Sequence, residues 1–303
     1  MDNLCHTLVG AAFGEAGLKR RTRFGNTTLM IAANLPDVDV LVFATGVPSV
    51  ALRRGWTHGA LALALLPVAL TAAMWAVSRM CPARGDRNPI RARALLLLSY
   101  VGVLSHVGLD LLNNYGVRLL MPFDRRWFYG DILFIIDPWL WLVLGAGVWL
   151  ARRRGAPHVA SQALIVAAFY VGAMCVSARL ARHVVLDEWR AARGGELLSL
   201  MVGPSPITPF RRQVIVDAGT HYETGTFDWL PTQVRFDSEK VPKNDHDPRV
   251  AQAREAPRIR GFLIWSRFPF WTLEAVSGGT RVTVSDLRFV GRGGPFVQST
   301  LVR

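Results

Sequence analysis

The chain has 303 residues, of which 51% are hydrophobic and 19% are charged, and its formal net charge is +13. The apolar content excludes a disordered chain, and the three cysteines, Cys5, Cys81 and Cys175, are too few for a disulfide scaffold. A water-soluble nucleic-acid-binding protein would account for the charge but not for the apolar content. An integral membrane protein accounts for both if its basic residues lie mainly on one side of the bilayer.

The first part of the chain is apolar and the second part is polar. Residues 1–181 contain 18 Lys and Arg against 9 Asp and Glu, and they hold the long apolar runs. The remaining residues alternate between polar and apolar side chains. We therefore predict a mainly α protein, with a polytopic helical membrane domain over 1–182 and a small soluble β-rich domain over 183–303.

Six apolar segments approach the roughly 20 residues that a helix needs to cross a bilayer. They lie at 2–18, 27–46, 59–78, 94–112, 132–151 and 162–178. The segment 59–78 carries no charge, whereas the first two segments contain acidic residues and could instead be half-inserted or buried against the others. Gly10 and Gly14 have the spacing that lets neighbouring helices pack closely.

Basic residues concentrate in three of the expected loops, which lie on one side if all six segments cross. These loops hold Lys19, Arg20, Arg21, Arg23, Arg79, Arg84, Arg87, Arg91, Arg93, Arg152, Arg153 and Arg154. The opposite loops hold only Arg53, Arg54, Arg118, Arg125 and Arg126. The positive-inside rule then predicts a protein of the bacterial cytoplasmic (inner) membrane, with its soluble domain outside. Because the basic residues sit in short membrane loops, we expect no nucleic-acid partner.

The soluble part contains stretches rich in β-branched and aromatic residues, bounded by Gly or Pro, which predict strands. These stretches are 213–218, 221–230, 258–266 and 280–290. The segment 240–257 is typical of a charged loop or a short helix. Pro204, Pro206 and Pro209 predict a stiff connector after the last membrane helix.

Ionisable side chains occur inside the apolar half, where each costs about 2.5–3.5 kcal/mol at the bilayer centre. They are Asp2, His6, Asp37, Asp39, His58, His106, Asp110, Asp131 and Asp137. His106 and Asp110 are four residues apart, so they share one helix face. In the expected topology all nine lie toward the outer side. Asp2 and Asp137 have a simpler explanation as helix N-caps, Asp37 and Asp39 as a helix end, and His58 as an interfacial cap.

Histidines and carboxylates without cysteine suit zinc, or a bimetallic site of Zn, Mn or Fe. We predict a divalent metal, with zinc favoured, held by histidines and by several of the aspartates of this set. A carboxylate that does not bind the metal can act as general base, and Asp37 and Asp131 are the candidate catalytic residues. Such a site activates water and stabilises charge on a phosphoryl or acyl oxygen.

An ordered set of motifs runs along the first 140 residues: M-D-N-L-C-H-T-L-V-G, N-L-P-D-V-D, R-G-W-T-H-G, S-H-V-G-L-D-L-L-N-N-Y-G-V and I-I-D-P. The set resembles the YdjM family of membrane-bound, metal-dependent hydrolases. The resemblance implies a hydrolase with a metal centre. Its ligands are then the residues that fall on the family's shared polar positions, which are His6, Asp37, Asp39, His58, His106 and Asp110. His106 and Asp110 are also similar to a ligand pair of zinc-dependent phospholipase C enzymes, which implies phosphoester hydrolysis on a membrane lipid or a lipid-linked substrate.

Two other functions remain open from the sequence. Intramembrane Asp and His residues also mark the proton or cation paths of ion-coupled transporters. A non-catalytic membrane scaffold would instead bind a partner through its β-rich domain, whose aromatic residues include Trp229, Trp265, Phe268 and Trp271. The oligomeric state cannot be read from the sequence.

Overall fold

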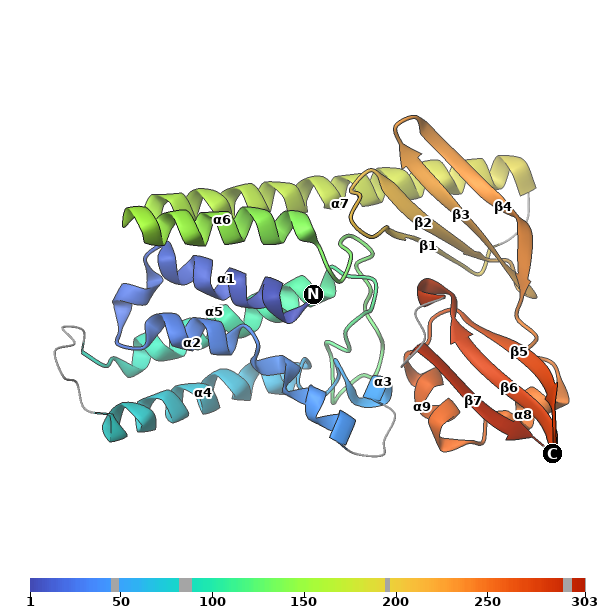
Figure 1. The fold of residues 1–303 in the computed structure, drawn as a ribbon, viewed down its shortest axis with the longest axis horizontal. Helices are drawn as coiled ribbons and strands as arrows, with labels where there is room; N and C mark the ends of the chain where they lie inside the picture. Colours follow the sequence, from blue (N-terminus) through green and yellow to red (C-terminus); the bar gives the residue numbers. More distant parts are fainter. Residues whose placement is uncertain (45–48, 82–88, 194–196, 291–295, 303) are drawn as a thin grey trace. The chain divides into compact units, whose positions relative to one another are not determined.

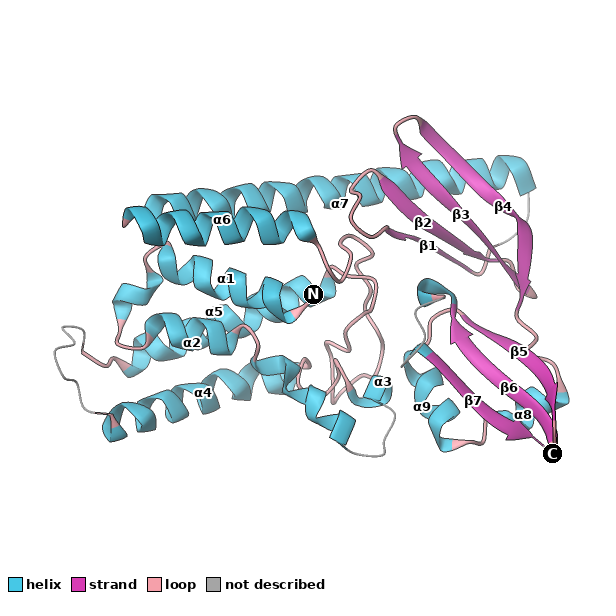
Figure 2. Cartoon of the chain, in the orientation of Figure 1, coloured by secondary structure: helices cyan, strands magenta, loops and turns pink. Residues whose placement is uncertain are grey.

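The computed structural model describes residues 1–44, 49–81, 89–193, 197–290 and 296–302. Helices dominate up to Arg193, and strands with two short helices follow (Figure 2). The chain divides into two compact units, one of 1–39 with 54–176 and one of 40–53 with 177–303. The expected boundary at residue 182 falls within helix α7, Pro157–Arg193, which contributes residues to both units.

The first unit is built from helices that pack side by side (Figure 1). They are α1 Asn3–Glu15, the 3-10 helix η1 Leu18–Arg21, α2 Gly25–Ala32, the start of the 3-10 helix η2 Leu35–Ala44, α4 Ala60–Met80, α5 Ala92–Leu111, α6 Pro138–Arg154 and the start of α7. Helix α1 packs against α2 and α6, and α5 packs against α2 and α4.

The expected six membrane spans are not confirmed. Among the described residues, three helices are long and apolar enough to cross a bilayer: α4, α5 and α7. Helices α1 and α2 have 13 and 8 residues, too few for a hydrocarbon core of about 30 Å at 1.5 Å per residue. Helix α2 ends before Pro36, whose nitrogen has no proton for a helical hydrogen bond. The two helices instead pack against neighbouring helices. This is the alternative that the acidic residues of the first two segments had suggested.

The predicted side of the membrane depended on six crossings. With three candidate spans, the outward position of the β-rich part stays a prediction. Two of the arginines used in that argument, Arg84 and Arg87, lie outside the described residues.

Small residues bring α1, α2 and α5 close together. A Cβ atom added at Gly10 would lie 2.8 Å from the Leu29 carbonyl oxygen, and one at Gly102 would lie 2.4 Å from the Ala32 Cβ. Both distances are below van der Waals contact, so only glycine fits at these crossings. The close packing predicted for Gly10 is confirmed, and it places α2 against both α1 and α5.

The two N-cap interpretations are also confirmed. The Asp2 carboxylate accepts hydrogen bonds from the first backbone amides of α1. The Asp137 carboxylate does the same for α6, which has Pro138 at its first position. Side-chain oxygens at these positions satisfy amides that the helix itself cannot pair.

The second unit contains two antiparallel sheets, ordered β1-β2-β3-β4 and β5-β6-β7. The strands are β1 Ser199–Pro204, β2 Arg211–Asp217, β3 His221–Trp229, β4 Thr232–Pro242, β5 Pro269–Val276, β6 Gly279–Asp286 and β7 Val297–Val302. The unit also holds α3 Ser49–Leu52, α8 Pro248–Ala253 and α9 Pro257–Trp265. The four-stranded sheet packs on the last part of α7, through Ala181, Val185 and Trp189.

The strand predicted over 258–266 is wrong, because this segment forms helix α9. Pro257 occupies the first helical position, which suits its fixed φ angle. The buried residues Ile259, Phe262 and Trp265 recur every three positions, a helical spacing that β-rich composition concealed. The stretches at 213–218, 221–230 and 280–290 do overlap β2, β3 and β6.

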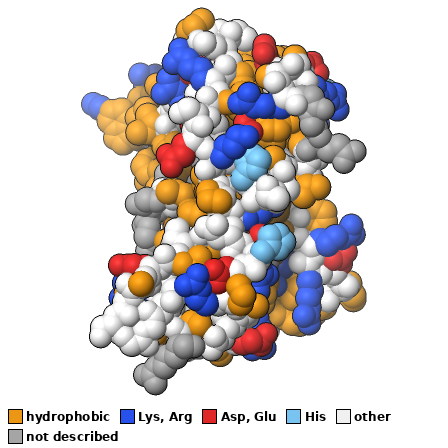
Figure 3. Space-filling model, turned by 90° about the vertical axis from the view of Figure 1, so that its right-hand side faces the viewer, with side chains coloured by type: hydrophobic (Ala, Val, Ile, Leu, Met, Phe, Trp, Pro, Cys, Tyr) orange, Lys and Arg blue, Asp and Glu red, His pale blue; other side chains and the backbone are white. Residues whose placement is uncertain are grey.

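On one face of the molecule, Figure 3 shows basic and acidic side chains interspersed among apolar ones.

Candidate metal centre

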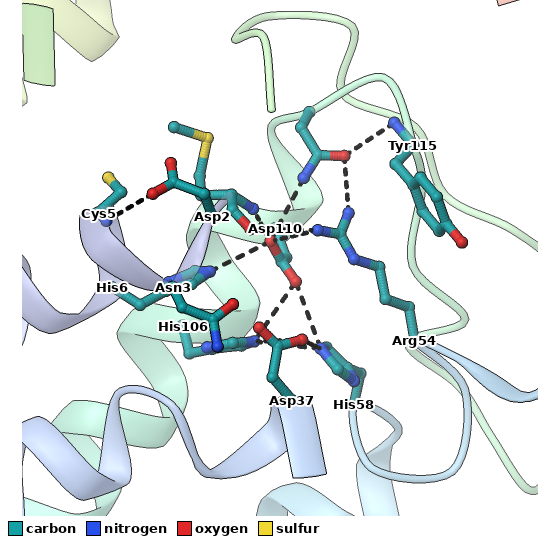
Figure 4. A network of polar contacts seen from close by, with 12 residues as sticks. Asp2, Asn3, Cys5, His6, Asp37, Arg54, His58, His106, Asp110 and Tyr115 are labelled. Atoms are coloured by element: carbon teal, nitrogen blue, oxygen red, sulfur yellow. Dashed lines mark hydrogen bonds and ion pairs between the residues drawn. The ribbon is translucent and has the colours of Figure 1, made fainter. Parts of the chain in front are cut away.

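Four of the predicted ligands converge inside the first unit. Asp37, His58, His106 and Asp110 are all buried, and one potential ligand atom of each lies within 4.8 Å of those of the others, so the cluster could hold a metal ion. Asp37 comes from η2, His58 from the turn before α4, and the other two from successive turns of α5. Figure 4 shows these side chains directed toward Asp110.

The ring of His106 is fixed by the backbone of a neighbouring helix. Its Nδ1 lies 2.7 Å from the carbonyl oxygen of Ala33, and a carbonyl can only accept a hydrogen bond. Nδ1 therefore carries the proton. In the neutral ring the Nε2 lone pair then points into the cluster, which is the state a metal ligand requires.

The ring of His58 is fixed in the same sense by two side chains. The Thr57 hydroxyl donates to Asp39 Oδ2 at 3.0 Å, and its oxygen lies 2.9 Å from His58 Nδ1. Because the hydroxyl proton is used, Thr57 accepts from Nδ1. Asp39 Oδ2 also lies 3.5 Å from Nδ1. Asp39 thus faces the ring nitrogen opposite the cluster, in the position from which a carboxylate orients a metal-binding histidine.

The donor set fits a divalent cation. The Nε2 atoms of His58 and His106 lie 3.1 Å apart, and Asp110 Oδ2 lies 3.3 and 3.4 Å from them. Among the described residues, Asp110 Oδ2 accepts no hydrogen bond. Two nitrogen lone pairs and a carboxylate oxygen aimed at one buried point require a positive charge there. Two histidines and two carboxylates are ligands that zinc, manganese and iron accept.

His6 lies at the edge of the cluster and is not one of the four. Its ring stacks on His106, with 3.8 Å between the ring centroids, and its Nε2 lies 3.4 Å from Asp110 Oδ1. Both ring nitrogens are buried without a hydrogen-bond partner among the described residues. His6 as a ligand stays a prediction.

Arg54 is a site residue that the sequence did not reveal, because it was counted only as a loop cation. Arg54 is only 4% exposed. The guanidinium lies 3.0 Å from Asp110 Oδ1 and donates to Asn113 Oδ1 at 2.9 Å. The N-terminal amine of Met1 also contacts Asp110 Oδ1. The positive Arg54 guanidinium therefore lies on the Oδ1 side of Asp110, whereas His58 and His106 lie on the Oδ2 side (Figure 4).

Asp131, the second candidate catalytic residue, is not a member of the cluster of four. It lies between α5 and α6 and has a left-handed φ of 54°. The backbone amides on either side of it, of Gly130 and Ile132, donate to the carbonyls of Asn113 and Leu112. Its catalytic role stays a prediction.

A groove of about 590 Å³ lies beside the cluster, between α1 and the segment formed by α2 and η2. It is lined by Asn3, Thr7, Thr27, Met30, Ile31, Asn34, Leu35, Asp37 and Val38. Asn34 donates to Thr7 Oγ1 and to the Met30 carbonyl, both at 2.9 Å. Asp37 belongs to both the groove and the cluster, so the groove reaches one of the candidate metal ligands.

Comparison with known proteins places these motifs in a family. The family model described as YdjM inner membrane protein matches residues 1–184. The chain belongs to the YdjM family. The match covers the whole metal-centre region. Membrane association is therefore supported by two observations, the family match and the three apolar helices.

A relative extends the similarity beyond the region that the YdjM model covers. The uncharacterized protein YfhP of Bacillus subtilis (strain 168) is 23% identical over 312 residues, covering 98% of this chain and 90% of that protein. The β-rich unit is therefore included in the similarity. No solved structure matches the chain.

Proposed function

We propose that this YdjM-family protein is a membrane-embedded, metal-dependent hydrolase that cleaves a phosphoester or another ester of a lipid or lipid-linked substrate. The observation that carries the proposal is the buried convergence of Asp37, His58, His106 and Asp110. The Nε2 atoms of His58 and His106 lie 3.1 Å apart, and a cation between two neutral rings would attract both lone pairs.

In this proposal the four residues hold the cation, zinc being favoured by the ligand set. When bound, the cation supplies Lewis acidity to a phosphoryl or acyl oxygen and lowers the pKa of a water molecule. Asp39 and Thr57 keep His58 in the required tautomer. Asp37 lines the groove, and its second carboxylate oxygen, which does not bind the cation, takes the proton of the attacking water. It returns this proton to the alkoxide that leaves when the ester bond breaks.

Arg54 favours a phosphoester over a neutral ester. A buried guanidinium is a strong partner for phosphoryl oxygens, because its planar N–H groups match their geometry. Its neighbour Asp110 also faces the histidines, so the cation and Arg54 approach the same carboxylate from two sides. A phosphoryl group held at the cation would lie near this second positive charge, which stabilises the negative charge that develops in the transition state.

The groove supports a substrate with an apolar portion. Met30, Ile31, Leu35 and Val38 provide apolar walls, and Asp37 lies where the groove meets the cluster. A lipid chain in the groove would bring its polar linkage to the candidate catalytic groups.

The test uses the full-length protein purified in detergent. Bound metal is measured by mass spectrometry, and hydrolysis is measured with bis(p-nitrophenyl) phosphate and with phospholipid vesicles. We expect bound divalent metal and metal-dependent phosphodiester hydrolysis, both lost in a His106→Ala, Asp110→Ala double variant. His158→Ala, at the start of α7 outside the cluster, serves as the matched control.

Full metal content in the double variant would refute the metal assignment. Bound metal without hydrolysis, combined with metal-independent ion transport in proteoliposomes, would favour a transporter instead. A partner protein captured through residues 183–303, with binding indifferent to His106, would favour the scaffold.

A further inference from the structure

One end of the four-stranded sheet carries exposed apolar side chains. Ile207 in the β1–β2 turn is 70% exposed, and Leu230 in the β3–β4 turn is 75% exposed. Phe210, which also precedes β2, is 54% exposed. The Trp229 amide donates to the Phe210 carbonyl at 2.9 Å, so the two turns are adjacent. Three exposed apolar residues on neighbouring turns form a patch of the kind that marks an interaction site.

Hydrogen bonds fix where this end lies along α7. Ser177 Oγ accepts from Trp229 Nε1 at 2.8 Å and from the Arg212 guanidinium at 3.3 Å. Toward the other end of β3, Glu223 pairs with Arg193 at 3.2 Å. Strand β3 therefore runs back along α7, and its Trp229 end points toward the earlier part of the helix.

The earlier part of α7 is the apolar part. Residues 162–178 carry no charge, and 17 helical residues span about 25 Å, close to the thickness of a hydrocarbon core. Ser177 lies at the end of this run, and the exposed Arg179 and Arg182 follow it, as basic residues do at the level of lipid headgroups. The turn end of the sheet, held at Ser177, thus lies beside the residue at which α7 would leave a bilayer.

We propose that the β1–β2 and β3–β4 turns form a lipid-binding surface that rests on the bilayer crossed by α7. Ile207, Phe210 and Leu230 insert among the headgroups and the upper acyl chains. Trp229, half-buried beside them, is an aromatic residue of the kind enriched at membrane interfaces. This surface is independent of the metal centre.

The local charge and backbone agree with a lipid partner. Arg211 is 54% exposed, whereas its partner Asp228 is buried, so the accessible charge of this pair is positive and suits anionic headgroups. Ile207 has a φ of 68°, a left-handed conformation that a β-branched residue rarely adopts. The turn presents this isoleucine side chain at the surface, where lipid contact would bury it.

The test places nitroxide spin labels on the full chain in nanodiscs of phosphatidylethanolamine and phosphatidylglycerol. Single cysteines replace Ile207, Phe210 or Leu230 in a background carrying Cys5→Ala, Cys81→Ser and Cys175→Ala. The matched control is Leu198→Cys, which is 70% exposed beside the opposite end of the same sheet. We expect the first three labels to collide more with oxygen than with a water-soluble nickel chelate, and the control to show the reverse.

Equal nickel access at all four positions would overturn the proposal. Protection of the three labels from both reagents would also overturn it, because a protein partner would then cover the turns. Hydroxyl-radical footprinting of the unmodified chain gives a second measurement that needs no substitution. It should protect Ile207, Phe210 and Leu230 in nanodiscs and leave Leu198 reactive, and uniform reactivity would equally contradict the lipid contact.

Discussion

The Nε2 atoms of His58 and His106 lie 3.1 Å apart, and each ring is already held through its Nδ1. Lone pairs that face each other at this distance repel, whereas a cation between the rings attracts both. Because the cluster is assembled only in the folded chain, metal binding and folding are expected to be linked.

The first prediction is that chelation lowers the melting temperature. A cation at 100 times its dissociation constant stabilises a single-site protein by about 2.7 kcal/mol. A thermal-shift measurement in detergent, with and without a chelator, checks this. The shift should persist in His158→Ala and disappear in the His106→Ala, Asp110→Ala double variant. An unchanged shift in the double variant would place the stabilising metal elsewhere.

The second prediction separates Asp39 from the ligands. Asp39 accepts from Thr57 and from the Arg54 amide, on the side of His58 away from the cluster. Asp39→Asn should weaken metal binding by about 10–100-fold while the stoichiometry at saturating metal is retained. Titration with a competing chelator measures the affinity, and Asp124→Asn in an exposed loop pair is the control. Loss of the bound metal at saturation, as expected for His58→Ala, would instead make Asp39 a ligand.

The third prediction concerns substrate charge. Arg54→Lys keeps the positive charge but removes the planar fork that matches phosphoryl oxygens. Hydrolysis of bis(p-nitrophenyl) phosphate should fall by about 10²–10³-fold, while p-nitrophenyl acetate hydrolysis and metal content change little. The ratio of the two rates is the readout. Equal losses on both substrates would indicate that Arg54 only supports Asp110.

The fourth prediction links helix packing to the metal centre. A Cβ atom at Gly102 would lie 2.4 Å from Ala32 Cβ and 2.9 Å from the Ala33 amide, whereas one at Gly108 would meet nothing within 4 Å. Gly102→Ala should destabilise the unit by about 1–3 kcal/mol. It should also weaken metal binding, because Ala33 holds His106. Gly108→Ala on the same helix should do neither, and equal behaviour of the two variants would contradict this packing.

The fifth prediction concerns a buried ion pair in the β-rich unit. Burial alone would raise the pKa of Asp286, but Arg288 and hydrogen bonds from Ser266 and the Arg288 amide hold this pKa below its ordinary value. The stabilisation is present above the ordinary aspartate pKa of about 3.9. It is lost as the pH falls from there through the lower pKa of the folded state.

Asp286→Asn should therefore cost about 3–5 kcal/mol at neutral pH and flatten the acid limb of the stability profile. Urea unfolding followed by tryptophan fluorescence at several pH values measures both effects. Glu274→Gln, which breaks an exposed pair with Arg281, should cost no more than about 1 kcal/mol. A similar loss of stability in both variants would show that the buried pair stabilises the fold no more than the exposed pair does.

Local patterns predicted a large part of the candidate site. His106 and Asp110 had to share a face of α5, because four residues make about one helical turn. The N-caps Asp2 and Asp137 were readable because capping depends on adjacent residues. Arg54 was missed because nothing near it in the chain distinguishes a buried arginine from an arginine in a membrane loop. Helix α9 was missed because its composition resembles that of a strand.

The sequence by itself determined that this is an apolar, helix-rich membrane protein with a β-rich end and a set of Asp and His residues in its apolar half. Only the tertiary structure decided which of them meet. Asp37, His58 and the α5 pair are brought together where α2 lies against α5 at Gly102. That contact joins segments about 70 residues apart, and long-range packing of this kind leaves no periodic signal in the chain.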